Sequence, residues 1–175
     1  LTRINKAIRD GEFQKNPVLL AAFDEAKKRN SKVHFIGLVS EGGVHSSQAH
    51  LHTLCDMASA YSLEKVFVHA FTDGRDCDPK SGKAFIEELE HELVQSTGRI
   101  ASVVGRYYAM DRDKRWERIK KAYDVMVNGE GQGFSSAAEA IVASYENGVT
   151  DADIDKICNK EIDSPVVDSD SLNVQ

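Results

Sequence analysis

The sequence predicts an α/β fold with three layers, α/β/α, in which a largely parallel sheet is flanked by helices on both faces. Two observations predict it. Short runs rich in valine, isoleucine and phenylalanine alternate along the chain with longer segments whose apolar residues recur at helical spacing. Polar loops, some of them rich in glycine, follow the predicted strands. This alternation is typical of βαβ crossovers, which place parallel strands side by side with helices packed over them.

Two helices are expected before the first strand, at Thr2–Arg9 and Pro17–Arg29. Gly11 ends the first of them. Asn16 can cap the second helix with its side chain, and Pro17 suits the first helical position, where the amide hydrogen that proline lacks would have no partner.

Three strand–loop–helix units follow. Apolar residues at helical spacing mark the helices, as Phe85, Leu89 and Leu93 do on one stripe. The strands are expected at Lys32–Val39, Lys65–Phe71 and Arg99–Val104, and the helices at Ser46–Tyr61, Ser81–Gln95 and Arg112–Val127.

The last part of the chain is expected to begin with a glycine-rich loop over residues 129–133. The remaining elements are expected to be a helix at Ser136–Glu146, a short helix at Thr150–Cys158, a last strand at Asp163–Val167 and a fraying polar tail at Asp168–Gln175. A length of 175 residues suits one compact domain, which we expect over residues 1–167, followed by the tail at 168–175.

Composition excludes several classes of protein. The net charge of −6 offers no general attraction to nucleic acid or to anionic membranes, and no apolar run approaches the length of a membrane span. Three widely spaced cysteines without a CxxC pair argue against a disulfide framework or a zinc site. We do not expect the opening residues to be a signal peptide, and they resemble a chain entered partway through. We therefore expect a cytoplasmic protein that binds neither nucleic acid nor membranes. We also expect it to be a monomer.

Three polar loops follow the three main strands, and their side chains carry the candidate chemistry. Because the carboxyl ends of parallel strands meet at one edge of a sheet, we expect these loops to surround one pocket. The loops are Ser40–His45, Thr72–Asp76 and Gly105–Asp113. The candidate site residues are His45, Arg75, Asp76, Arg106 and Arg112.

These residue types suit a small hydroxy acid with several negative charges. Three arginines present planar forks that match carboxylate or phosphate oxygens. Asp76 can hold a hydroxyl group and remove its proton, His45 can donate or accept a hydrogen bond, and Gly42 and Gly43 would let the backbone approach a ligand.

Each feature also has a structural interpretation that the residues alone leave open. Gly42-Gly43 and Asp73-Gly74 are common in turns, and His45 could only cap a helix. Asp76 could merely pair with Arg75. The charged residues Arg112, Arg115, Asp111, Asp113 and Lys114 are typical of a solvated helix face. His34 and His69 lie within predicted strands and are expected to be hydrogen-bonded core histidines.

The three loops and their flanking strands closely resemble those of cofactor-independent phosphoglycerate mutases. The resemblance lies in three long motifs in the right order, Gly37–Ser46, His69–Asp76 and Gly105–Asp113, and it continues through Arg115–Arg118 to about Val167. It implies that the chain belongs to a family of glycolytic isomerases, which interconvert 3-phosphoglycerate and 2-phosphoglycerate through a phosphoserine.

The resemblance implies that residues 1–167 form the inserted substrate-binding domain of such an enzyme. His45, Arg75, Asp76, Arg106 and Arg112 would contact the substrate, and Asp76 would move the proton between O2 and O3. The serine and two Mn²⁺ ions would belong to a metallophosphatase domain absent from this chain, so no metal is expected here and the chain should not turn over alone.

Two other functions remain open at this point. The chain could be a stand-alone binding module for a different small anion, such as a sugar phosphate. It could also be a metal-dependent hydrolase that uses His45, Asp73 and Asp76, although these residues do not complete a ligand set.

Overall fold

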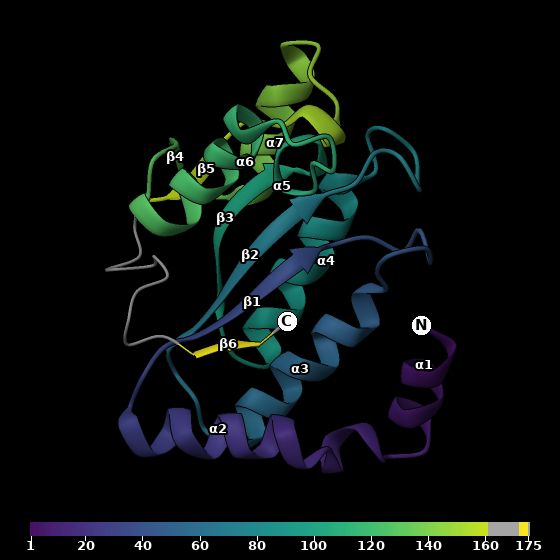
Figure 1. Cartoon of the computed structure of the whole chain (residues 1–175), viewed down its shortest axis with the longest axis vertical. Coiled ribbons are helices and arrows are strands. Elements are labelled where there is room, and N and C mark those ends of the chain that lie inside the picture. The colour runs from purple at the N-terminus through teal and green to yellow at the C-terminus, as the bar shows by residue number, and fades with distance from the viewer. Residues whose placement is uncertain (161–171, 175) are drawn as a thin grey trace.

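One sheet of six strands forms the centre of the computed structural model, which describes residues 1–160 and 172–174. The strand order is β4-β5-β3-β2-β1-β6 (Figure 1). The pairs are parallel except β3 with β5, which is antiparallel. The strands are β1 at Val33–Leu38, β2 at Val66–Thr72, β3 at Arg99–Gly105, β4 at Gln132–Phe134, β5 at Ile157–Asn159 and β6 at Leu172–Val174.

The register of β1, β2 and β3 brings their carboxyl ends to one edge of the sheet. Leu38 lies opposite Phe71, and Thr72 lies opposite Gly105. The ladder between β2 and β3 shifts by one residue between Val68 and His69, yet the ends remain level. The three loops that follow these strands therefore start side by side.

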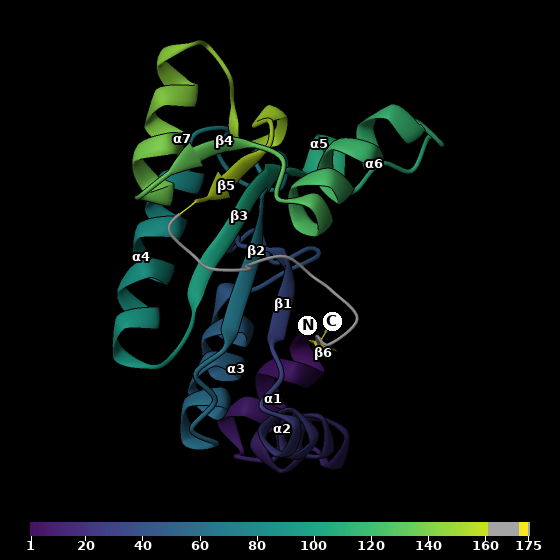
Figure 2. The same cartoon turned by 90° about the vertical axis from the view of Figure 1, so that its left-hand side faces the viewer.

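Helices cover both faces of the sheet, which confirms the predicted α/β class. Figure 2 shows α3, α4 and α7 along one face and α5 and α6 along the other. None of the helices within residues 1–160 and 172–174 combines the length and apolar character needed to cross a membrane. The helices are α1 at Thr2–Arg9, α2 at Pro17–Arg29, α3 at Gln48–Ala60, α4 at Gly82–Gln95, α5 at Arg106–Ala109, α6 at Trp116–Tyr123 and α7 at Ala137–Glu146.

Successive side chains along a strand point to opposite faces of the sheet, so the buried apolar residues are divided between the two faces. The larger core includes Phe35 and Val68 from the strands and Ile86 and Leu89 from α4, all almost completely buried. A smaller cluster beneath α5 and α6 contains residues such as Val104. Burial of these side chains is the main force that holds the layers together.

A buried polar chain crosses the sheet from β1 to β3. His34 Nδ1 lies 2.8 Å from His69 Nε2, and His69 Nδ1 lies 2.7 Å from Ser102 Oγ. Burial, with a smaller contribution from His34, lowers the pKa of His69 to about 3, so its ring is neutral at physiological pH. The expectation of hydrogen-bonded core histidines is confirmed.

The region after β3 differs from the sequence-based expectation. The predicted loop contains the short helix α5, and α6 begins at Trp116 rather than Arg112 because the intervening residues form a loop. After α6 the chain makes a π-helical turn at Asp124–Asn128. The glycine-rich segment after this turn, predicted as a loop, supplies the short strand β4.

Two predictions for the end of the chain were wrong. Thr150–Cys158 is not a helix but a 3₁₀ turn at Asp151–Asp153 followed by β5, which buries Ile157 and Cys158 against its neighbours. The expected fraying tail contains β6, whose backbone pairs with β1. The strand predicted at Asp163–Val167 lies outside the described residues.

The 3₁₀ turn Asp151–Asp153 packs against the carboxyl end of β3. The Gly105 amide donates to the carbonyl oxygen of Ile154 at 2.7 Å. A Cβ atom added at Gly105 would lie only 2.1 Å from the carbonyl oxygen of Ala152, far inside van der Waals contact. A glycine is therefore required at this strand end.

Replacing Gly105 with alanine should lower the free energy of unfolding by about 3 kcal/mol, because the turn must move away from the strand end. Gly37→Ala is the matched control, since nothing lies within 4 Å of the added methyl group in β1. Urea denaturation of both variants checks the difference. Equal stability of the two would contradict the steric argument.

Candidate functional site

A cavity of about 370 Å³ opens at the carboxyl ends of β2 and β3. Its volume suits a small molecule. All five residues selected from the sequence line it, together with residues of α5 and of the loop that follows α5. The lining residues are His45, Arg75, Asp76, Arg106, Tyr107, Met110, Asp111, Arg112, Asp113, Arg118 and Ala152.

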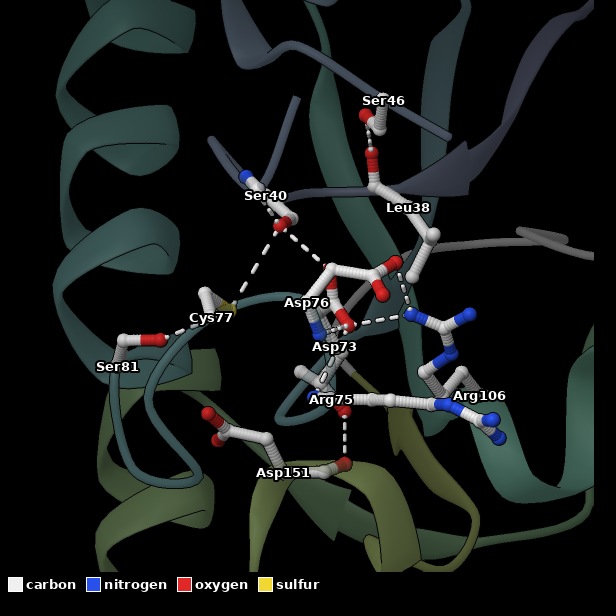
Figure 3. Close-up of polar contacts among 12 residues, drawn as sticks. Leu38, Ser40, Ser46, Asp73, Arg75, Asp76, Cys77, Ser81, Arg106 and Asp151 are labelled. Atoms are coloured by element: carbon white, nitrogen blue, oxygen red, sulfur yellow. Dashed lines mark hydrogen bonds and ion pairs between the residues drawn. The ribbon is translucent and has the colours of Figure 1, made fainter. Parts of the chain in front are cut away.

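Asp73, at the end of β2, connects the three strand-end loops through its buried carboxylate (Figure 3). Its Oδ2 accepts from the Ser40 hydroxyl at 2.7 Å, and its Oδ1 accepts from the amides of Arg75 at 3.1 Å and Asp76 at 3.0 Å. Arg106 Nη1 also donates to Oδ1 at 2.5 Å. One side chain thus fixes the relative positions of the three loops.

Arg106 lies between two carboxylates. Its Nη1 donates to Asp76 Oδ2 at 2.7 Å as well as to Asp73. Burial alone would raise the pKa of Asp73, but hydrogen bonds from the Asp76 amide, Ser40 and Arg106 hold that pKa below its ordinary value. The two carboxylates likewise outweigh the desolvation of Arg106 and raise the pKa of its guanidinium. Asp73 and Arg106 are therefore both charged at neutral pH.

The loop after β1 comes very close to Asp76. A Cβ atom added at Gly42 would lie 2.8 Å from Asp76 Cβ, so only glycine permits this approach. The Gly42 amide donates to Ser40 Oγ at 3.0 Å. The Ser46 hydroxyl donates to the carbonyl oxygen of Leu38 at 2.6 Å and folds the loop back over the strand end. Gly42 therefore serves close packing between loops.

Asp111 organises the loop that carries Arg112. Its side chain is 1% exposed, and its carboxylate accepts from the amides of Asp113 at 3.1 Å and Arg115 at 2.8 Å. Arg118 pairs with the same carboxylate at 3.3 Å. The interpretation of Asp111 as part of a solvated helix face was therefore wrong.

Arg118 was not selected from the sequence, yet it lines the cavity. Its guanidinium lies over the Tyr107 ring, 3.9 Å from the ring centre. Neither Asp73 nor Arg118 could be identified from spacing, because Asp73-Gly74 is a common turn pair and Arg118 lies within a charged helical stretch. The contacts of both residues are tertiary.

Arginines outnumber aspartates among the residues that line the cavity. Four arginines and three aspartates line it. Asp76 pairs with Arg106 rather than with Arg75. Within residues 1–160 and 172–174, the side chains of Arg75 and Arg112 form no ion pair, and both residues are exposed at the cavity. Their guanidinium groups are therefore available for an anionic ligand.

A metal centre is not formed by the part of the chain that the structure describes. No group of three or more histidine, cysteine, aspartate or glutamate side chains there is arranged to hold a metal ion. Asp73 and Asp76 both bind Arg106 instead. No observation favours the hydrolase that would use His45, Asp73 and Asp76.

Residues 4–174 match the family model described as "BPG-independent PGAM N-terminus". The chain is 52% identical over 170 residues to the 2,3-bisphosphoglycerate-independent phosphoglycerate mutase of Bacteroides fragilis, covering 97% of this chain and 34% of that protein. It is 54% identical over 152 residues to the enzyme of the same name from Clostridium perfringens, covering 86% and 30%. The chain thus spans about a third of the length of these relatives.

A solved structure is also similar. It is a crystal structure of Leishmania mexicana phosphoglycerate mutase at low cobalt concentration, with a TM-score of 0.87 and 29% sequence identity. The match covers 97% of this chain and 33% of that chain.

Replacing Asp73 with asparagine should lower the free energy of unfolding by about 3 kcal/mol at neutral pH, because Arg106 loses a buried partner. The folded-state pKa of Asp73 lies below its ordinary value, so its stabilising contribution is present above the unfolded-state pKa and is lost as pH falls through the folded-state pKa. The difference between the two proteins should therefore shrink below about pH 4.

Urea denaturation at a series of pH values measures this difference. Asp113→Asn is the control, because Asp113 lines the same cavity but is exposed, and this change should alter stability by less than about 0.5 kcal/mol. A difference for Asp73→Asn that stays constant as pH falls would contradict the charged role of the carboxylate.

Proposed function

The chain belongs to the family of BPG-independent phosphoglycerate mutases, and from this membership we propose that its cavity binds phosphoglycerate. The chain would be the substrate-binding part of a longer glycolytic isomerase that interconverts 3-phosphoglycerate and 2-phosphoglycerate. The observation that carries the proposal is the convergence of His45, Arg75, Asp76, Arg106 and Arg112 on one cavity.

The charges at the cavity support a small acid with two anionic groups. Arg75 and Arg112 would bind the carboxylate and the phosphate, because guanidinium forks match both groups and these two side chains are not engaged in ion pairs within the described residues. Arg106 is already bound to Asp73 and Asp76, and it would hold the Asp76 carboxylate in place beside the ligand. His45 would donate a hydrogen bond at the rim.

Asp76 would act as the base for the ligand's hydroxyl groups. Its carboxylate lines the cavity, where Arg106 holds Oδ2 at 2.7 Å, and a carboxylate oxygen in that place can accept the proton of a ligand hydroxyl. As a substrate hydroxyl becomes a nucleophile toward a phosphoryl group, its proton would pass to Asp76. Asp76 would return the proton to the other oxygen, so that O2 and O3 exchange roles.

The remaining machinery would lie elsewhere in the longer protein. The phosphoserine and the two Mn²⁺ ions that the family resemblance implies would belong to a metallophosphatase part, the natural partner of this chain, and the residues of this chain would use no metal. We further propose that the chain acts in the cytoplasm as a monomer and that it binds phosphoglycerate without turning it over.

Titration with 3-phosphoglycerate should shift the backbone amide resonances of the three strand-end loops, saturating at millimolar ligand. Arg75→Met and Arg112→Met should each weaken binding about 10- to 100-fold, because a charge-assisted hydrogen-bonding partner contributes about 1.5–3 kcal/mol. Two-dimensional NMR of the labelled chain measures both effects.

Arg115→Met is the matched control, since Arg115 follows the same loop but does not line the cavity, and binding should be unchanged. Glucose 6-phosphate serves as the competing ligand. Saturable binding of glucose 6-phosphate without binding of 3-phosphoglycerate would replace the proposal with a binding module for another anion.

A further inference from the structure

Asp151 is a completely buried aspartate outside the cavity. Its carboxylate accepts a hydrogen bond from the amide of Gly82, the first residue of α4, at 2.7 Å. The hydroxyl of Tyr145 donates to the other carboxylate oxygen. The side chain of Asp151 therefore joins α4 to α7. Figure 3 shows Asp151 beneath the loop that links β2 to α4.

The backbone of Asp151 holds both ends of that same loop. Its carbonyl oxygen accepts from the Thr72 hydroxyl at 2.6 Å, just before Asp73, and its amide donates to the carbonyl oxygen of Pro79 at 2.9 Å. Arg75 and Asp76 lie between these two attachment points. One residue thus sets the span of the loop that carries two of the proposed ligand-binding residues.

The packing around Asp151 leaves no room for adjustment. A Cβ atom added at Gly82 would lie 2.5 Å from Asp151 Oδ1, and one added at Gly74 would lie 2.9 Å from Asp151 Cβ. Ala152, the next residue, lines the cavity itself. A shift of Asp151 would therefore be transmitted directly to the cavity.

A buried carboxylate is costly, and this cost argues for a role beyond packing. Burial raises the pKa of Asp151 above its ordinary value, although hydrogen bonds from Tyr145 and the Gly82 amide oppose the rise. The position at the N-terminus of α4 partly offsets the desolvation of the charge. An apolar side chain would avoid the desolvation but could not bind the first amide of α4.

We propose that Asp151 is a positioning residue, which fixes the Thr72–Pro79 loop so that Arg75 and Asp76 face the ligand before it binds. The proposal rests on the proposed function, because the ligand is taken to be phosphoglycerate. Loss of the clamp would give the loop additional conformations, and binding would then have to restrict them at the expense of affinity.

Asp151→Ala tests the clamp, because it removes the two side-chain hydrogen bonds that hold the Asp151 backbone, and with it both ends of the loop, in place. The dissociation constant for 3-phosphoglycerate should rise roughly tenfold, and hydrogen exchange of the Arg75 and Asp76 amides should accelerate by roughly the same factor. Asp151→Asn keeps an acceptor for the Gly82 amide and should restore most of the affinity.

Gly82→Ala alters the partner of the Asp151 carboxylate in the same contact. It provides a second test if Asp151→Ala does not fold. The added methyl group should displace the carboxylate and weaken binding in the same direction. Phe23→Leu is the stability control, because Phe23 is fully buried and belongs to α2. Figure 1 shows α2 at the opposite end of the sheet, so this change should lower stability without changing affinity.

Two outcomes separate this proposal from the function on which it rests. If the unaltered chain does not bind 3-phosphoglycerate, the proposed function fails, while faster exchange confined to the Arg75 and Asp76 amides still supports the clamp. The other outcome is that the unaltered chain binds 3-phosphoglycerate, but Asp151→Ala and Gly82→Ala behave like Phe23→Leu. All three variants would then have lower stability, with unchanged affinity and unchanged hydrogen exchange in the loop. That result would overturn the positioning role of Asp151.

Discussion

The carboxylate of Asp73 is the constraint on which the site depends, because it is shared by all three strand-end loops. Parallel pairing brings the loops to one edge, but it does not determine their distance or orientation. Asp73 determines these by accepting from Ser40, from two amides of its own loop and from Arg106. Its burial strengthens these interactions, since little water competes for the same oxygens.

Buried aspartates have the same architectural role in two further places. Asp111 accepts from backbone amides and an arginine in the loop after α5, and Asp151 accepts from the start of α4. Each loop is thus ordered by an internal acceptor rather than by the molecule it would bind. Exposed guanidinium groups such as those of Arg75 and Arg112 remain available, which is the arrangement that electrostatic preorganisation requires.

Sequence reasoning recovered the elements whose signals are local. Helical spacing and strand composition identified the three main βα units, and the strand-end rule selected five residues that line one cavity. Sequence reasoning failed where tertiary contacts determine the local structure. Nothing local distinguishes Thr150–Cys158 from a short helix, because β5 exists only through its pairing with β3 and β4. The contacts of Asp73 and Asp111 were inaccessible for the same reason.

The strand order has a consequence for synthesis of the protein. Both outer parts of the sheet come from late segments: β4 and β5 beside β3, and β6 beside β1. During translation the central strands therefore emerge from the ribosome with unpaired backbone groups along two edges. The nascent chain must keep these edges from aggregating until residues 132–174 arrive, which gives β4, β5 and β6 a protective role before any ligand is present.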